Sequence, residues 1–476
     1  MKILYASSEA VPFIKTGGLA DVAGTLPIEM KKQGIDIRVV LPLYSKIPSH
    51  FREKMKKIGE YYTDLTWRRQ YVGVYCLEYE GVIFYFLDNE QYFKRDGLYG
   101  YPDDGERFTF FAKAVALLPK IIDFKVDIIH TNDWHTAMVN VYLQDFKRGD
   151  KFYERIKSVF TIHNLKYQGI FPSQMLFDVA GLDGMYYNEE SLKYYDTINM
   201  MKGGIVFSDA FTTVSKTYAQ EIRYPYFGET LEGIVNRHYY KMMGIINGID
   251  YQVWNPETDE YLPYHYSLTN WEDGKKLIKK EIQKKYGLPE KDVLMIAMIT
   301  RMVKNKGLDL VRHIFDELIQ EDIQFVILGT GDNSYEESFR YFAWRYPDKV
   351  ASRIYYNEEE SHQVYAASDL FLMPSLMEPC GISQLIALRY GSLPIVRETG
   401  GLKDTVKSYN EFEKSGNGFS FANINAHDML YTIRRALYFL GIEADKRQLI
   451  KNAMNSKNSW ETSSKEYIKL YKTLIK

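Results

Sequence analysis

Hydrophobic runs alternate with amphipathic segments along most of the chain. Short apolar runs that predict buried strands lie at residues 3–6, 35–41, 82–87, 126–130, 158–162 and 210–214 in the first half, and at residues 293–299, 325–328, 370–373 and 394–396 in the second half. Segments of helical period separate them, as at residues 308–318 and 384–390. Such alternation is typical of parallel sheets whose faces are covered by helices. The pattern therefore predicts an α/β fold.

Helix ends and domain boundaries can also be placed from the pattern. The first helix is expected over residues 19–33, where Gly34 suits the position past its end and Pro27 should kink or interrupt it. Poorly periodic sequence follows residues 247–250, and a charged helix is expected at residues 275–285. A length of 476 residues favours two or three domains. We expect domains at residues 1–245 and 246–458, with an amphipathic helix at residues 459–476 that can cover either one.

Composition narrows the class of protein. The formal net charge of -2 makes nucleic acid an unexpected partner. Two cysteines exclude a disulfide framework, no apolar run is long enough to cross a bilayer, and the chain begins with a strand rather than a signal peptide. We therefore expect a cytoplasmic protein. The 40 tyrosines either stack on sugar rings or reflect a compositional bias.

A Thr-Gly-Gly-Leu tetrapeptide occurs twice, at residues 16–19 and 399–402. Each copy follows an apolar run and precedes a segment of helical pattern. Glycines let backbone N–H groups approach a ligand, and the dipole of the following helix favours negative charge. The pair suggests two lobes that hold a phosphorylated ligand, although each copy alone can also be an ordinary turn.

Polar residues gather at the carboxyl ends of the predicted strands, where open α/β sheets bind their ligands. They are Lys15, residues 132–135, His163, Asn164, Arg301, residues 329–332, Glu378 and Thr399. This distribution is the strongest functional signal that comes from the residues alone.

Individual members of this set allow two interpretations each. Arg301 and Lys306 can neutralise a diphosphate, or they belong to a solvated basic loop. Glu378 can bind a ribose diol, or it only favours the start of the next helix. His163 can contact a sugar or can be structural. Asp133 can pair with the His135 imidazole, or it can only cap a helix.

Other kinds of catalytic site find no support in the chain. Neither cysteine lies in a nucleophile motif, there is no Gly-x-Ser-x-Gly elbow, and no Cys or His cluster has the spacing of a metal site. A nicotinamide dehydrogenase is disfavoured because no Gly-x-Gly-x-x-Gly follows the first strand.

Taken together, long segments of the chain resemble the bacterial glycogen synthases and plant starch synthases, which are retaining glucosyltransferases with the GT-B fold. The matching segments are residues 15–22, 103–108, 132–135, 161–165, 167–169, 213–215, 247–250, 306–309, 378–381 and 397–402. The chain departs from the family pattern at two positions. It has Asn305 where glutamine is usual and Lys216 where proline is frequent. Neither position is assigned to chemistry.

The resemblance implies two Rossmann-like domains that face each other across a deep cleft, with the final helix crossing back to the N-terminal domain. It implies ADP-glucose as donor, with UDP-glucose left open, and glycogen or another α-1,4-glucan as acceptor, with no metal or other cofactor, no nucleic acid and no membrane. Lys15, Asp133, His163, Arg301, Lys306 and Glu378 would be catalytic. The donor would also contact Gly17, Gly18, Gly329, Tyr356, Cys380, Gly381, Thr399, Gly400 and Gly401, and Asp21 and Asn247 would lie on the acceptor side. The oligomeric state stays open.

The mechanism that the resemblance favours is a front-face displacement, because no residue stands out as the nucleophile of a double displacement. Lys15, Arg301, Lys306 and the Gly-Gly amides would stabilise the departing diphosphate. Two alternatives remain: a GT-B transferase that uses a small-sugar acceptor, and a glucan-binding protein without activity.

Overall fold

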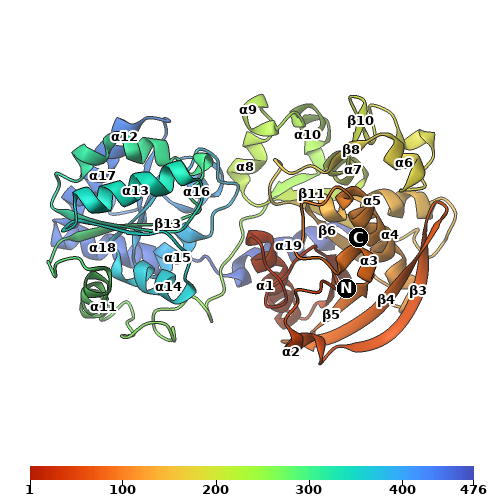
Figure 1. The fold of residues 1–476 in the computed structure, drawn as a ribbon, viewed down its shortest axis with the longest axis horizontal. Coiled ribbons are helices and arrows are strands. Elements are labelled where there is room, and N and C mark those ends of the chain that lie inside the picture. Colours follow the sequence, from red (N-terminus) through yellow and green to blue (C-terminus); the bar gives the residue numbers. More distant parts are fainter. The chain divides into compact units, whose positions relative to one another are not determined.

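The computed structural model describes residues 1–476, which form two compact units. Unit 1 comprises Met1–Ile246 together with Trp460–Lys476, and unit 2 comprises Asn247–Ser459. Figure 1 colours the chain from end to end and shows that each unit is built around its own sheet. The final segment of the chain therefore belongs to the unit in which the chain begins.

The sheet of unit 1 has nine strands, of which seven run parallel. Their order is β12 (Met242–Gly244), β11 (Ala210–Thr213), β7 (Lys157–Ile162), β6 (Ile128–Asn132), β1 (Lys2–Ala6), β2 (Asp36–Pro42), β5 (Val82–Asp88), β4 (Arg68–Tyr79) and β3 (Lys56–Leu65). β4 pairs antiparallel with β5, and β3 pairs antiparallel with β4 at the sheet edge. From β1 the chain builds the sheet in one direction through β2 and then returns to β6 on the other side, so the topological switch point lies between β1 and β6.

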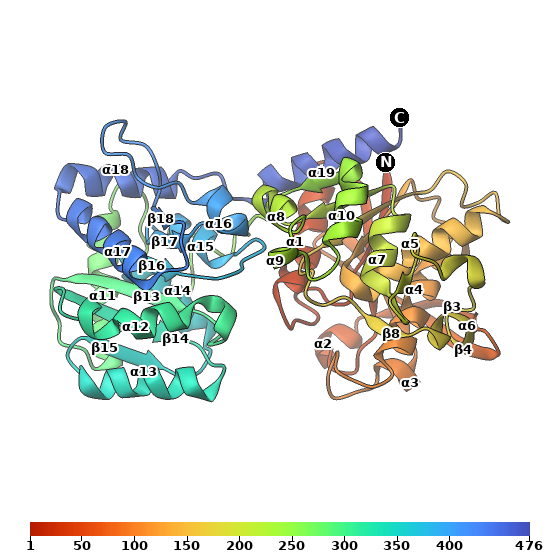
Figure 2. The same ribbon diagram turned by 90° about the horizontal axis from the view of Figure 1, so that it is seen from above.

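Helices and a small second sheet complete unit 1. The helices are α1 (Gly18–Lys32), α2 (Ser49–Arg52), α3 (Glu90–Phe93), α4 (Asp104–Ile121), α5 (Asp133–Lys147), α6 (Gln174–Asp178), α7 (Met200–Phe207), α8 (Lys216–Glu221), α9 (Pro225–Gly228), α10 (Glu232–His238) and α19 (Trp460–Leu474). The small sheet has the order β8 (Ile170–Pro172), β10 (Thr197–Asn199) and β9 (Lys193–Tyr194). Figure 2 shows α19 lying along α1, and the Gln33 side chain joins the two helices by donating to Ser464 Oγ at 2.5 Å.

Unit 2 has a parallel sheet of six strands with the order β15 (Val350–Arg353), β14 (Ile323–Leu328), β13 (Leu294–Ile299), β16 (Leu370–Met373), β17 (Leu393–Arg397) and β18 (Phe419–Phe421). In Figure 1, α12 (Leu308–Leu318) and α13 (Asn333–Arg345) cover one face, and α11 (Trp271–Tyr286) and α14 (Glu358–Ala367) cover the other. The remaining helices are α15 (Ser383–Arg389), α16 (Gly400–Thr405), α17 (Ala426–Leu440) and α18 (Glu443–Met454). The switch point of this sheet lies between β13 and β16.

The helix α1 corrects one expectation. It runs without interruption from Gly18 to Lys32, with Pro27 inside it. Leu26, Pro27 and Met30 are buried on the face that packs within the unit. Burial of this apolar stripe offsets the backbone hydrogen bond that proline removes, so Pro27 does not interrupt the helix.

Candidate active site

The residues predicted to carry chemistry in unit 1 lie on the loops that follow β1, β6 and β7, at the carboxyl edge of the sheet. The β1 loop carries Lys15, whose Nζ lies 2.7 Å from Asp21 Oδ1 in α1. This ion pair is half exposed, so Lys15 remains accessible to a ligand. Gly18 is the first residue of α1.

The first Thr-Gly-Gly segment differs from the open anion site that its sequence suggests. Thr16 donates its backbone N–H and its hydroxyl to Glu9 Oε2, at 2.5 and 2.7 Å. The N–H of Gly17 also donates to the Glu9 carboxylate. The Thr16 amide and the amide of Gly17, which was expected to contact the donor, therefore face an acidic side chain of the protein itself. No motif in the sequence marks Glu9.

Asp133 is the first residue of α5 and has a left-handed backbone with φ of 52°. Its carboxylate accepts from the backbone N–H of His163 at 2.8 Å and of Asn164 at 3.4 Å. It thus joins the β6 and β7 loops, and it neither pairs with His135 nor caps its own helix. Burial raises the pKa of Asp133 to about 7.

His135 lies in an aromatic stack rather than beside a carboxylate. Its ring centroid lies 4.1 Å from that of Trp134, 4.4 Å from that of Tyr99 and 4.7 Å from that of Phe108. Burial lowers the pKa of His135 to about 3, so the imidazole is neutral. The alternative of an Asp133–His135 acid–imidazole pair is therefore wrong.

His163 is oriented by Asn132, a residue whose sequence context predicts no role of its own. Asn132 Nδ2 donates to the Ala6 carbonyl at 2.9 Å, which leaves its Oδ1 to accept from Tyr5 at 3.0 Å and from His163 Nε2 at 2.8 Å. His163 therefore carries its proton on Nε2. Burial lowers the pKa of His163 to about 3, so it offers a neutral imidazole to a ligand.

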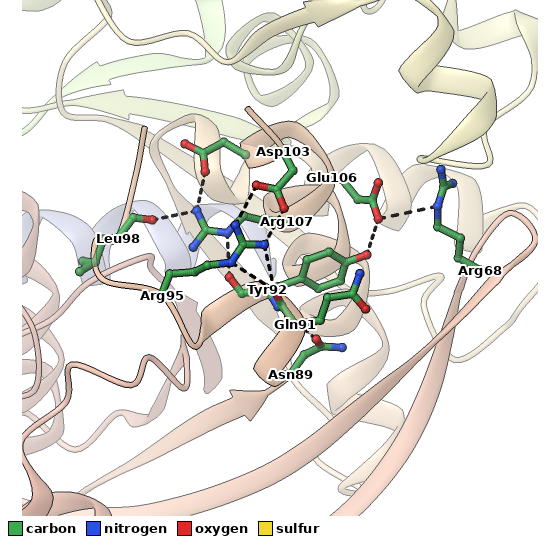
Figure 3. Close-up of polar contacts among 10 residues, drawn as sticks. Arg68, Asn89, Gln91, Tyr92, Arg95, Leu98, Asp103, Glu106 and Arg107 are labelled. Carbon is green, nitrogen blue, oxygen red and sulfur yellow. Dashed lines mark hydrogen bonds and ion pairs between the residues drawn. The ribbon is translucent and has the colours of Figure 1, made fainter. Parts of the chain in front are cut away.

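The segment between β5 and α4 is anchored by arginines, as Figure 3 shows. The fully buried Arg107 donates to the carbonyls of Tyr92 at 2.8 Å and Leu98 at 3.1 Å and pairs with Asp104. Arg95 pairs with Asp103 at 2.7 Å. The motif at residues 103–108 thus has a structural role in this unit.

This anchored segment carries Tyr99 to the same edge of the sheet. The Tyr99 hydroxyl lies 2.7 Å from Ser8 Oγ in the β1 loop, and its ring covers His135. No motif marked Tyr99, because its placement depends on contacts far along the chain.

In unit 2 the two loops that flank the switch point bring Lys306 and Glu378 together. Lys306 follows β13 and Glu378 follows β16, and Nζ lies 2.6 Å from Oε2 in a mostly buried ion pair. Ser375 Oγ donates to the same carboxylate oxygen at 2.9 Å. The Arg301 side chain lies on the same loop as Lys306, is exposed and forms no ion pair. These contacts place a paired cation and carboxylate and an unpaired guanidinium at the sheet edge where ligands bind.

Close backbone approach fixes the geometry of this pair. The Leu376 N–H donates to the Asn305 carbonyl at 2.8 Å. Gly307 has φ of 72°, and a Cβ there would lie 2.0 Å from the Pro374 carbonyl oxygen. A side chain at residue 307 would push the two loops apart.

Gly307→Ala is therefore expected to destabilise unit 2 by more than about 1 kcal/mol, the usual cost of a left-handed alanine, because the clash adds to that cost. Gly287→Ala is the matched control, since Gly287 has φ of 74° and a Cβ there would meet nothing within 4 Å. Thermal melting of both variants measures the difference. Equal losses would contradict the close-approach argument.

The second Thr-Gly-Gly segment braces the loop that carries Glu378. The Gly401 N–H donates to the carbonyls of Glu378 at 3.2 Å and Pro379 at 3.1 Å. A Cβ at Gly400 would lie 1.9 Å from the Glu378 oxygen, and one at Gly401 would lie 2.0 Å from the Cys380 oxygen. Thr399 is fully buried at the start of α16. The Gly401 amide is thus engaged within the protein, and the role of this segment in binding a phosphate stays a prediction.

The other predicted donor residues occupy neighbouring loops of unit 2. The Gly329 N–H donates to the Arg353 carbonyl at 3.0 Å, and Tyr356 is exposed and donates to Glu358. Gly381 has φ of 72°. Burial raises the pKa of the Cys380 thiol to about 12.

Asn247, which was expected on the acceptor side with Asp21, belongs to unit 2, whereas Asp21 belongs to unit 1. Its backbone N–H donates to the Cys380 sulfur. No cluster of three or more His, Cys, Asp or Glu side chains is arranged to hold a metal ion. None of the helices combines the length and apolar character needed to cross a membrane.

Comparisons with known proteins identify the family. Residues 2–237 match the family described as starch synthase catalytic domain, and residues 278–455 match glycosyl transferases group 1. The glycogen synthase of Finegoldia magna is 61% identical over 477 residues, which cover 100% of both chains. The chain belongs to the glycogen synthase family. The glycogen synthase of Bacillus cytotoxicus is 53% identical, again over 100% of both chains.

Solved structures of this and related families share the fold. The catalytic domain of starch synthase IV from Arabidopsis thaliana, bound to ADP and acarbose, has a TM-score of 0.91 and 32% identity over 100% of this chain and 99% of that one. Sucrose-phosphate synthase from Thermosynechococcus elongatus, at 16% identity and a TM-score of 0.62 over 99% and 98% of the two chains, shares the fold alone. This member of the glycogen synthase family is a glycosyltransferase with the GT-B fold, as its sequence predicted.

Proposed function

We propose that the chain transfers glucose from ADP-glucose to the non-reducing end of glycogen or another α-1,4-glucan, with retention of configuration. The observation that carries the proposal is the Lys306–Glu378 pair at the switch point of unit 2, with Arg301 unpaired on the same loop. Cations beside a carboxylate suit a nucleoside diphosphate, because the cations bind its phosphates and the carboxylate binds its ribose diol. The relatives named above as glycogen synthases and the starch synthase that was solved with ADP support this choice of substrates.

The proposal assigns the residues of each unit a separate task. In unit 2, Arg301 and Lys306 bind the diphosphate and Glu378 the ribose, with Gly329, Tyr356, Cys380, Gly381, Thr399, Gly400 and Gly401 shaping the donor site. In unit 1, Lys15 with Gly17 and Gly18 acts on the donor phosphates. The neutral His163 imidazole contacts the transferred glucose, and Asp133 lies near the reacting centre or the acceptor.

The reaction that these groups favour is a front-face displacement. The bond between the glucose C1 atom and the phosphate oxygen breaks as the acceptor hydroxyl oxygen bonds to C1 on the same face, and the departing phosphate accepts the hydroxyl proton. Lys15, Arg301 and Lys306 stabilise the negative charge that develops on the diphosphate. Their positive charges do so without a metal ion. A cytoplasmic location, which suits two free cysteines, is part of the same proposal.

The test is a comparison of donors with glycogen as acceptor, in which nucleoside diphosphate release and glucan growth are measured separately. We expect growth with ADP-glucose and a clear preference for it over UDP-glucose. Preference for UDP-glucose would contradict the donor assignment. Diphosphate release that requires a small sugar instead of glycogen would contradict the acceptor assignment, and no transfer by folded protein would contradict the reaction.

A further inference from the structure

Glu9 is a buried carboxylate in the loop between β1 and α1. The residue is 3% exposed, and no lysine or arginine pairs with it, because the nearby Lys15 pairs with Asp21 instead. Its negative charge is met only by hydrogen-bond donors, namely the Thr16 N–H at 2.5 Å, the Thr16 hydroxyl at 2.7 Å and the Gly17 N–H. All of these donors belong to the two residues that follow Lys15.

Such an arrangement is costly for the fold. Burial of a carboxylate without a cation is unfavourable, and it raises the pKa of Glu9 while the Thr16 and Gly17 donors oppose the rise. An apolar side chain would fill the same space at lower cost. What the carboxylate adds is a fixed conformation for the loop that carries Lys15.

The same loop touches the other groups of the unit 1 site. Ser7 Oγ donates to the Glu9 carbonyl at 2.7 Å, and Ser8 Oγ lies 2.7 Å from the Tyr99 hydroxyl. The negative charge of Glu9 also acts on Asp133, where it adds to the effect of burial in raising the pKa. Glu9 is therefore linked both to the loop geometry and to the charge of the site.

We propose that Glu9 is a positioning residue of the transfer reaction, whose carboxylate clamps residues 15–18 in the conformation that presents Lys15 to the donor. This inference rests on the proposed function. Glu9 acts through the loop and does not touch the substrate.

Two single variants separate the geometry of the clamp from its charge. Glu9→Gln keeps the size and one acceptor oxygen but removes the charge, and Thr16→Val removes the hydroxyl donor at an exposed position and keeps the charge. Both should lower kcat/KM for ADP-glucose, by on the order of tenfold for Glu9→Gln, the effect of losing a hydrogen bond to a charged group. The double variant should be little worse than Glu9→Gln alone, because both changes break the same contact.

The pH dependence of kcat gives a second test. A merely structural role of Glu9 would leave this pH dependence unchanged. The titratable groups around Glu9 are Asp21 on α1, Asp133 on α5, Tyr44 and Tyr99. Burial raises the pKa of both tyrosines well above the usual value. Removing the Glu9 charge lowers the pKa of Asp133, so the acid limb of kcat against pH should move to lower pH in Glu9→Gln. It should stay in place in Thr16→Val.

Hydrogen exchange tests the clamp without relying on activity. The amides of Thr16 and Gly17 should exchange faster in Glu9→Gln than in the wild type, with little change elsewhere. Glu29→Gln, the same replacement near the other end of α1, is the control and should leave kinetics and exchange unchanged. Folded Glu9→Gln with wild-type kcat/KM, pH profile and exchange would overturn the proposal. If the Thr16 and Gly17 amides of the wild-type protein exchange slowly but the protein transfers no glucose, the proposed function is overturned, whereas the contact of Glu9 with residues 16 and 17 is retained.

Discussion

Lys306→Ala is expected to lower kcat by about 10²- to 10³-fold, the usual effect of removing one group that stabilises developing negative charge. Lys306 holds Glu378 at 2.6 Å on the two loops that flank the switch point of unit 2. In the proposed reaction its ammonium group stabilises the departing diphosphate, so the loss falls on turnover. The measurement is steady-state kinetics with ADP-glucose and glycogen.

Melting temperature separates this role from a structural one. When Lys306 is removed, Glu378 keeps the hydrogen bond from Ser375 and water can take the place of the ammonium group at this sheet edge, so the fold should melt near the wild-type temperature. Lys304→Ala is the matched control, because Lys304 lies exposed on the same short turn and makes no ion pair. It should leave kcat within a few-fold of wild type. A large loss of melting temperature in Lys306→Ala would show that the residue holds the fold and would refute its assignment.

Asp133→Asn is expected to lower kcat by about 10²-fold or more while it stabilises the protein at alkaline pH. Asparagine tolerates the left-handed backbone at residue 133, and its amide oxygen can still accept from the His163 N–H. The variant loses the carboxylate charge, which the proposed function places near the reacting centre or the acceptor. Wild-type kcat should therefore rise with pH through about 7, where Asp133 ionises, and the variant should lack this step.

The stability effect follows from the direction of the pKa shift. Asp133 has a pKa of about 7 in the folded protein and about 4 in the unfolded chain. Between these two pKa values the native state binds more protons than the unfolded chain, so the free energy of unfolding falls as pH rises from about 4 to about 7. Asparagine has no charge to bury, and at pH 8 the variant should unfold at a higher denaturant concentration than wild type. Asp145→Asn, on the same helix, is the control and should change neither the activity nor its pH dependence. An Asp133→Asn variant that is fully active and less stable than the wild type would contradict both the expected loss of kcat and the expected gain in stability.

Strong periodicity made much of the fold predictable. The helix expected at residues 308–318 is α12 (Leu308–Leu318), and the run at residues 370–373 is β16 (Leu370–Met373). The strand expected at residues 126–130 is shifted to β6 (Ile128–Asn132), because its polar end pairs with β7. The β3–β4 hairpin was not predicted, since half-exposed strands at a sheet edge lack continuous apolar runs.

The candidate site was predictable by position but not by contact. Strand ends showed that Lys15, Asp133 and His163 would lie at one edge of the unit 1 sheet and Lys306 and Glu378 at one edge of the unit 2 sheet, because the carboxyl ends of parallel strands share an edge. Which groups pair depends on loop conformation. The Glu9–Thr16 and Gly401–Glu378 contacts show that each Thr-Gly-Gly segment also braces a neighbouring loop, and no spacing in the sequence predicts these contacts.

The most direct test of the central claim is the structure of the product made from ADP-glucose and a maltooligosaccharide. Proton NMR of the purified product reports the anomeric configuration and linkage of the added sugar. The account predicts a chain longer by one α-1,4-linked glucose at its non-reducing end, with one ADP released for each glucose added. A β-linked product, or ADP release with free glucose as the only sugar formed, would contradict it.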